Sequence, residues 1–192
     1  MDPTERSELI LTAASRAFAS RPYEEVSLAA IADEAHASEA LVHKYFVSKA
    51  GIYAQVLQRA TDELAERTRQ TDDALPPDSS ARDRVRASIL TYLDFIAERS
   101  PGWMAYQILA GHEPGEAAQV RQAAREAAVA ALSDVVGGGR GHRDDFAFWG
   151  YLGFLDDACL RWVRAGCPAE QRHSLVDAAL GCLEGALGDW RA

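Results

Sequence analysis

The sequence predicts an all-α protein of about nine helices, and three observations lead to this fold class. Apolar residues recur at the 3.6-residue spacing of amphipathic helices along the chain, whereas the alternating pattern of β-strands is nearly absent. Serines, prolines and glycines interrupt the pattern at intervals of helix length. With 192 residues, 48% of them hydrophobic and 26% charged, the chain is long enough to bury a globular core.

The first helix is expected over residues 4–20. Asp2 and Glu5 can form a capping box around Pro3, and a proline suits the first helical position. The acidic start and the charge of Arg16 argue against a secretory leader here, so a cytoplasmic protein is expected. The apolar face of the helix consists of Ile10, Ala13, Ala14, Ala17 and Phe18.

Serine caps place the next three helices. We expect Ser27 to begin a helix that runs to about residue 35, Ser38 one that runs to about residue 45, and Ser48 one that runs to about residue 71. The polar stretch 71–78 is the clearest linker.

Five further helices are expected in the second half of the chain. They cover about residues 80–98, a segment that begins at Ser100-Pro101, a segment from Pro114 to about Val136, and residues 143–165 and 169–188. Glycines break the chain at 137–141, where no strand precedes and no Gly-Lys-Ser/Thr follows, so a phosphate loop is excluded.

The charge of the chain limits its possible partners. A net charge of −9 argues against a nonspecific nucleic-acid coat, but sequence-specific binding needs only a local positive footprint. The two lysines, Lys44 and Lys49, lie five positions apart, yet residues 1–50 hold five basic and eight acidic residues, a net of −3. No apolar run approaches the ~18 residues of a membrane span, so no membrane partner is expected.

Residues 27–46 read as two short capped helices joined by a turn of about three residues. Ala32 and Ala35 are small enough for two helices to cross closely. A hairpin this short cannot fold alone and would pack on the helix of residues 4–20, which is the arrangement of a helix-turn-helix. Lys49, in the first turn of the next helix, would make a good phosphate clamp.

The segment from about residue 8 to residue 57 resembles the TetR family of repressors. The matching residues are Ile10, Leu11, Ala13, Ala14, Phe18, Tyr23, Ser27, Ile31, Ala32, Ala35, Ser38, Tyr45, Phe46, Ser48 and Lys49. The resemblance implies a homodimer in which residues 1–47 form a three-helix DNA-binding domain. It also implies that residues 48–192 form a helical ligand-binding and dimerisation domain, with residues 48–71 as its connecting helix.

The same resemblance implies double-stranded operator DNA and a small-molecule effector as partners, with no cofactor and no catalysis. Carried over position by position, the DNA-contacting residues are Ser27, Ser38, Glu39, Ala40, Leu41, His43, Lys44, Tyr45 and Lys49.

Four positions depart from the family pattern. His36 stands where the turn ordinarily has glycine, which predicts a strained or altered backbone there. His43 replaces a frequent aromatic residue and Pro22 replaces a glycine. Glu39 would either accept a hydrogen bond from a cytosine amino group or repel phosphates. For His43 itself, contact with DNA and a packing role are equally open.

Other classes of protein find less support in the sequence. His112 and Glu116 have the spacing of a metal pair, but Pro114 and Gly115 between them spoil a helix, and no common catalytic motif is present. The helix-turn-helix segment could also be a helical hairpin without a DNA role. The three cysteines, an odd number without a CxxC pair, are expected to be reduced packing residues rather than a redox pair.

Aromatic residues are concentrated between residues 92 and 162, as in an apolar sensor cavity or an ordinary core. The candidates to line such a cavity are Trp103, Tyr106, Gln107, Phe146, Trp149 and Asp156. Asp157 has the spacing of an intrahelical ion pair with Arg161, while Asp156 could fix a cationic ligand. In the last helix a face of small residues suggests a dimer interface, although a buried helix would show the same spacing; its members are Ala178, Gly181, Cys182 and Gly185.

The sequence therefore predicts a ligand-responsive transcriptional regulator, expected to be a repressor. It would bind a palindromic operator as a dimer and be released by a small apolar or aromatic molecule, as the helix of residues 48–71 shifts and changes the half-site separation. The alternative is a TetR-like ligand-binding protein whose DNA affinity is weak or lost, which the charge of −3 and Glu39 favour.

Overall fold

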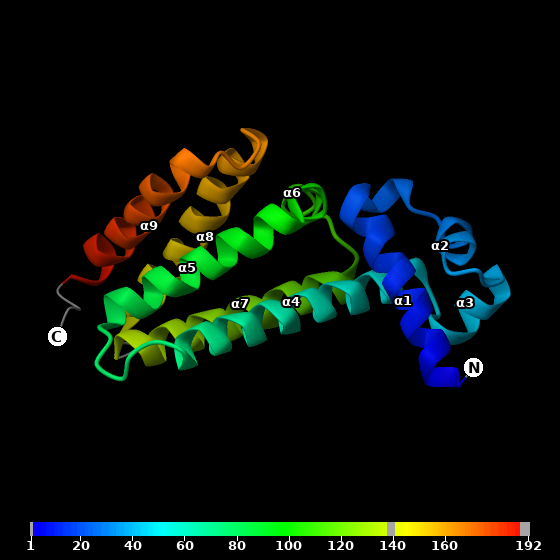
Figure 1. Ribbon diagram of the computed structural model, residues 1–192, viewed down its shortest axis with the longest axis horizontal. Helices are drawn as coiled ribbons and strands as arrows, with labels where there is room; N and C mark the ends of the chain where they lie inside the picture. The colour runs from blue at the N-terminus through cyan, green and yellow to red at the C-terminus, as the bar shows by residue number, and fades with distance from the viewer. Residues whose placement is uncertain (1, 138–140, 189–192) are drawn as a thin grey trace. The chain divides into compact units, whose positions relative to one another are not determined.

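The computed structural model describes residues 2–137 and 141–188, and its helices confirm the all-α fold class (Figure 1). These residues form nine α-helices and two 3-10 helices, with no strand among them. The α-helices are α1 (Pro3–Ser20), α2 (Leu28–Glu34), α3 (Glu39–Tyr45), α4 (Lys49–Asp73), α5 (Ala81–Glu98), α6 (Ser100–Ile108), α7 (Gly115–Val136), α8 (His142–Arg164) and α9 (Arg172–Leu187). The 3-10 helices are η1 (Tyr23–Glu25) and η2 (Ala169–Gln171).

Two boundaries differ from the sequence prediction. Helix α4 continues into the expected linker and ends at Asp73, where the Ala74 N–H still donates to the Gln70 carbonyl at 3.2 Å. Beside this end, Arg84 of α5 donates two hydrogen bonds to the Asp72 carboxylate, one of them 2.7 Å long. Helix α9 begins at Arg172 rather than at residue 169, since η2 precedes it. Of the predicted glycine break at 137–141, residues 138–140 lie outside the described part of the chain.

The chain divides into two compact units. The first comprises Met1–Asp62 and Arg99–Gln122, and the second Glu63–Glu98 and Ala123–Ala192. Helices α4 and α7 therefore begin in the first unit and end in the second. The expected functional division, at residues 47 and 48, remains a prediction.

The core of the first unit is not made by its N-terminal helices alone. Its fully buried members include Ile10 of α1, Ile31 of α2, Val42 of α3 and Ile52 of α4. Ala117 of α7 is equally buried in the same core. Three more residues from α6, α7 and the turn between them pack against it: Tyr106, Leu109 and Val120.

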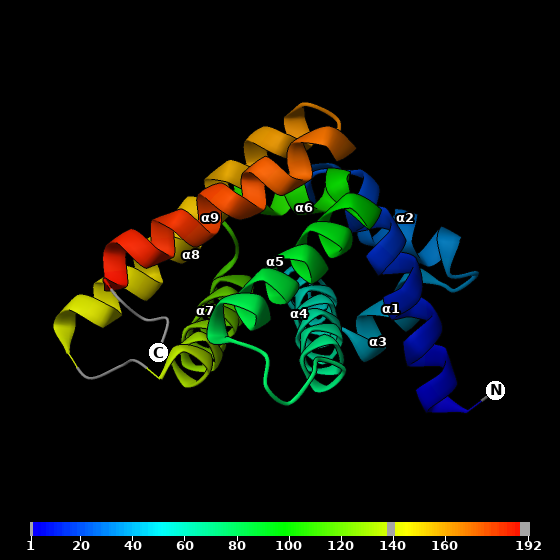
Figure 2. The same ribbon diagram turned by 60° about the vertical axis from the view of Figure 1, so that its left-hand side comes forward.

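In the second unit, α8 and α9 lie side by side, and α5 contacts both of them (Figures 1 and 2). Leu93 of α5, Phe148 of α8 and Leu183 of α9 are almost fully buried. Three ion pairs tie α9 to α5, with nitrogen–oxygen distances of 2.5–2.9 Å: Arg82–Glu184, Arg86–Asp177 and Arg172–Asp94.

No helix in the described part of the chain combines the length and the apolar character that crossing a membrane requires.

Candidate nucleic-acid interface

Two serine caps set the lengths of the helices in the helix-turn-helix. The Ser27 hydroxyl accepts a hydrogen bond from the backbone N–H of Ala30 at 3.1 Å, at the start of α2. The Ser38 hydroxyl accepts one from the N–H of Leu41 at 3.2 Å, at the start of α3. Each bond satisfies an N–H that has no partner within the helix, so both helices begin where the sequence predicts.

The turn between α2 and α3 depends on a left-handed histidine. His36 has φ of 49°, a region that residues with a side chain rarely adopt. The N–H of Ala37 donates to the carbonyl of Ala32 at 2.9 Å and closes the turn. Of the two outcomes expected at His36, the structure has the strained one, because the histidine keeps a left-handed conformation that a glycine would adopt without strain.

Helix α3 is anchored by its apolar side and exposes its polar side. Val42 is fully buried and Phe46, which follows the helix, is 2% exposed. Glu39, His43 and Lys44 are exposed, and the Glu39 and His43 side chains lie 4.0 Å apart across one helical turn. A packing role for His43 is thus wrong, because its side chain is 51% exposed.

The other residues carried over from the family are also placed within the first unit. Ser27, Ser38 and Ala40 are exposed, while Leu41 and Tyr45 are half-buried. All five lie on α2, α3 or their N-caps, so α3 brings most of the predicted contact set onto one short helix.

Lys49 is held in place by Tyr23. Its ammonium group donates to the Tyr23 carbonyl at 2.8 Å and lies 4.2 Å from the centre of the Tyr23 ring. An ammonium group has three donors, so two remain for a phosphate. The ring of Tyr23 lies 4.9 Å from that of Tyr53, which in turn is 4.8 Å from the ring of Phe18. Burial in this aromatic cluster raises the pKa of Tyr53 well above its usual value.

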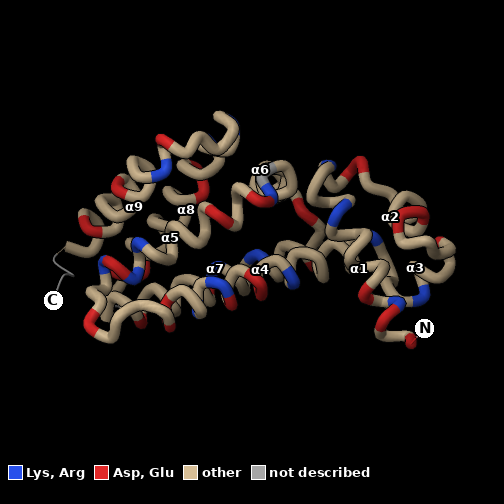
Figure 3. Tube along the Cα trace, viewed as in Figure 1, with Lys and Arg blue, Asp and Glu red and all other residues tan. Residues whose placement is uncertain are grey.

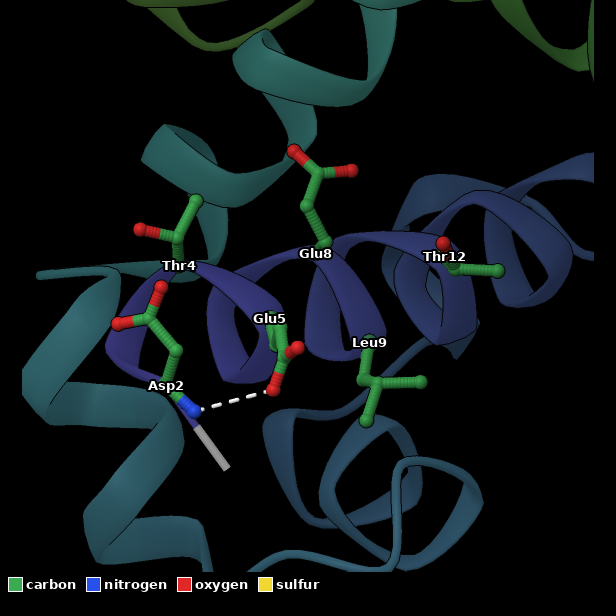
Figure 4. Close-up of a pocket in the computed structure, with 6 residues that line it drawn as sticks. All are labelled: Asp2, Thr4, Glu5, Glu8, Leu9 and Thr12. Atoms are coloured by element: carbon green, nitrogen blue, oxygen red, sulfur yellow. Dashed lines mark hydrogen bonds between the residues drawn. The ribbon is translucent and has the colours of Figure 1, made fainter.

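The start of α1 has the opposite electrostatic character (Figure 3). A shallow pocket there is lined by Asp2, Glu5 and Glu8 around the half-exposed Leu9 (Figure 4). The backbone N–H of Asp2 donates to the Glu5 carboxylate at 3.0 Å, as the predicted capping box requires. Arg59 of α4 pairs with Glu8 at 2.9 Å, so Asp2 and Glu5 are the carboxylates of this pocket that would repel a phosphate.

The candidate ligand-binding residues lie in both units. Trp103, Tyr106 and Gln107 belong to α6 in the first unit. Phe146, Trp149 and Asp156 belong to α8 in the second unit. Trp103 is 7% exposed, whereas Phe146 is 74% exposed.

Asp156 is engaged by the protein itself. It accepts a hydrogen bond from the Tyr92 hydroxyl at 3.1 Å and another from the Arg125 guanidinium, whose carbon lies 5.9 Å from the Trp149 ring. The carboxylate therefore already has a cationic partner within the chain. The expected ion pair between Asp157 and Arg161 is wrong, because the two side chains form none in the described structure.

The small residues predicted for a dimer interface lie along one side of α9. Ala178, Gly181 and Gly185 are exposed and Cys182 is half-buried. A Cβ atom added to either glycine would meet nothing within 4 Å. All three cysteines are free thiols, and burial raises the pKa of the Cys159 thiol.

A buried polar cluster near α6 and α7 was not predicted. Arg121 of α7 donates to the Glu113 carboxylate at 2.5 Å and to the Tyr106 carbonyl at 2.6 Å. Its guanidinium carbon lies 3.5 Å from the centre of the Tyr106 ring. The eight-residue separation of Glu113 and Arg121 matches no helical pair rule, so nothing in the sequence pointed to this contact. Tyr23 was missed as the partner of Lys49, although it is one of the residues that match the family.

Capped helices of this length, packed as a helix-turn-helix with an exposed polar second helix, define a DNA-binding protein of the helix-turn-helix class. Residues 10–56 match the family model described as "Bacterial regulatory proteins, tetR family". The chain is 32% identical over 171 residues to the HTH-type transcriptional activator FasR from Mycolicibacterium smegmatis, covering 87% of this chain and 76% of that protein.

Solved structures have the same fold. A tetR-family transcriptional regulator from Streptomyces coelicolor has a TM-score of 0.80 at 23% identity, covering 98% of this chain and 91% of that one. The transcriptional regulator FadR from Bacillus subtilis, in complex with stearoyl-CoA, has a TM-score of 0.71 at 16% identity, covering 94% and 97%. The chain belongs to the TetR family, and it is a DNA-binding transcriptional regulator rather than an enzyme.

Proposed function

We propose that the protein binds a palindromic operator as a homodimer, with α3 of each subunit in a major groove. The observation that carries this proposal is the exposed polar side of α3, presented by a helix whose other side is anchored through Val42. Lys44 and Lys49 supply positive charge at this surface, and the half-sites would lie about 34–36 Å apart or a multiple of that. DNA binding would place the protein in the cytoplasm.

The experiment that tests operator recognition is selection of bound duplexes from a random pool, with the wild-type protein and Glu39→Gln side by side. Recovery of a palindromic consensus supports the proposal. If Glu39 accepts from a cytosine amino group, Glu39→Gln should relax the preference for that base pair by about 1–3 kcal/mol. Failure to enrich any sequence would favour the alternative, a TetR-like ligand-binding protein that has lost DNA affinity.

We propose that the dimer forms through the exposed sides of α8 and α9. Phe146 and Phe154 on α8 are 74% and 36% exposed, which is unusual for large apolar side chains. Gly150 of α8 and Gly181 of α9 leave space into which a facing helix could fit closely. An isologous contact of this kind would give the two-fold symmetry that a palindrome requires.

The effector is proposed to be a small, largely apolar molecule bound by the α8 candidates Trp149 and Asp156, with Arg125, the partner of Asp156, as the group that fixes a negative charge. FadR from Bacillus subtilis was solved with stearoyl-CoA, a long apolar chain joined to an anionic carrier. Titration of the protein with stearoyl-CoA, and with CoA alone, tests this class of ligand. Binding of stearoyl-CoA that Arg125→Gln weakens supports the proposal, and equal binding of CoA alone contradicts an apolar site.

We propose that effector and operator oppose each other through a shift of α4. The two must then weaken each other's binding by one shared factor, typically about 5–150-fold. The expected repression is a further proposal, and the FasR relative is named an activator. A promoter–reporter assay with and without the gene determines the sign, and higher expression in the presence of the protein would contradict repression.

A further inference from the structure

The first unit contains residues 99–122 as well as the helix-turn-helix. Residues 99–122 pack closely against the N-terminal helices at two places, one on α6 and one on α7. At the first place, Gly102 of α6 lies against α1, so that an added Cβ would be 2.6 Å from the Cα of Ala19. At the second, Ala117 of α7 is fully buried in the core that contains Phe18 and Tyr53. The segment of α6 and α7 is therefore part of the DNA-binding unit.

Arg121 joins these two helices to each other. Arg121 contacts the Glu113 carboxylate and the Tyr106 carbonyl. Its own side chain is 12% exposed and that of Glu113 is 3% exposed. The second carboxylate oxygen of Glu113 is buried and has no hydrogen-bond partner. A buried ion pair with one oxygen left unsatisfied adds little net stability, so its presence points to a role in fixing geometry.

A series of side-chain contacts connects the Arg121 cluster with the residues that would bind DNA. Tyr106 packs against the core that contains Tyr53, the ring of Tyr53 touches that of Tyr23, and Tyr23 holds the ammonium group of Lys49. Glu116, five residues before Arg121 on α7, has a carboxylate oxygen 3.2 Å from the position of a Cβ on Gly51, in the first turn of α4.

We propose that Arg121 is a positioning residue for the operator-binding surface. Arg121 fixes the first turns of α7 against α6. It thereby keeps Tyr106 and Ala117 packed with the core that contains Tyr53, and so holds Tyr23 and Lys49 in place. An effector that displaced this contact would loosen the surface without touching DNA. The inference rests on the proposed function, since it concerns how the operator-binding surface is held.

The test combines operator titration with amide hydrogen exchange in the full-length protein. Arg121→Gln is expected to weaken operator binding by roughly 2- to 30-fold. It should also speed exchange in residues 23–26 and in the first turns of α4, α6 and α7. Glu113→Gln should act in the same direction, and the double variant should be no worse than Arg121→Gln alone, because both remove one contact.

Two control variants separate positioning from a general loss of stability. Arg84→Gln removes an ion pair with two hydrogen bonds in the second unit, and it should leave operator affinity and exchange in the first unit unchanged. Ile10→Val opens a small cavity in the same core and should speed exchange throughout the first unit rather than in selected segments.

The proposal would be overturned if amide hydrogen exchange in Arg121→Gln matched that of the wild type. It would also be overturned if exchange became faster throughout the first unit, as expected for Ile10→Val. Additive effects of the Arg121 and Glu113 variants would likewise overturn it. If the wild-type protein binds no operator, the proposed function fails by itself, while the exchange pattern still tests whether Arg121 positions Tyr23 and the start of α4.

Discussion

The close contact between α6 and α1 makes Gly102→Ala a demanding test of the structure. The added methyl carbon would lie 2.6 Å from the Ala19 Cα, 3.0 Å from the Ala19 carbonyl oxygen and 3.1 Å from that of Phe18. All three neighbours are backbone atoms, so no side chain can rotate away. Ordinary van der Waals contact begins near 3.4 Å, whereas the added carbon would lie 2.6 Å from the Ala19 Cα. Helices α1 and α6 would therefore have to separate by about the 0.8 Å between these two distances.

The expected magnitude follows from two opposing effects. Forcing an extra carbon into a packed site costs about 1–3 kcal/mol, and replacing glycine by alanine in a helix returns up to about 1 kcal/mol. We expect Gly102→Ala to lower the free energy of unfolding by about 1–2 kcal/mol, measured by urea denaturation. Gly115→Ala is the control, since a Cβ at this first residue of α7 meets nothing within 4 Å, so that stability should stay unchanged or rise by up to about 1 kcal/mol. If Gly102→Ala were as stable as Gly115→Ala, the close approach of α6 to α1 would be refuted.

Three further outcomes are expected. Ser38→Ala should cost about 0.5–2 kcal/mol of unfolding free energy by removing the cap of α3, and Ser38→Asp should restore most of it; equal stability of all three proteins would contradict the cap. Hydrogen bonding with Arg84 lowers the pKa of Asp72, so the pair stabilises the protein above the unfolded pKa of about 3.9 and loses its effect as the pH falls below it. The stability difference between the wild type and Arg84→Gln should therefore be largest near neutral pH and vanish in acid, and a difference that does not change with pH would contradict this origin. Gly181→Glu should leave the protomer folded, because α9 has open space there, but should weaken self-association in sedimentation equilibrium; unchanged association would exclude this side of α9 from the proposed interface.

Local signals made the helix-turn-helix predictable from the sequence. Ser27 and Ser38 cap the helices that they were expected to cap, because an N-cap depends on contacts within three residues. The unusual backbone at His36 was also predicted, since a tight turn between two helices needs a left-handed residue whichever side chain occupies it.

Contacts between distant segments could not be predicted in this way. Asp156 is paired with Arg125, 31 residues earlier, whereas the helical spacing rule suggested an ion pair between Asp157 and Arg161 that does not form. The burial of Ala117 among α1–α4 depends on how α7 packs, and an alanine carries no sign of this in the sequence. Arg121 and Glu113 meet across a turn whose geometry no periodicity describes. The candidate ligand and dimer residues remain predictions for the same reason.

Operator titration at several salt concentrations, with the wild type, Lys44→Ala and Arg69→Ala, asks whether α3 carries the DNA-binding surface. Lys44 is exposed on α3, while Arg69 is an exposed charge of α4 in the second unit and serves as the control. We expect salt-dependent binding, and for Lys44→Ala a weaker affinity with a salt slope reduced by about one per subunit. Arg69→Ala should bind as the wild type does. Equal affinities and slopes for Lys44→Ala and the wild type would contradict an operator-binding surface on α3.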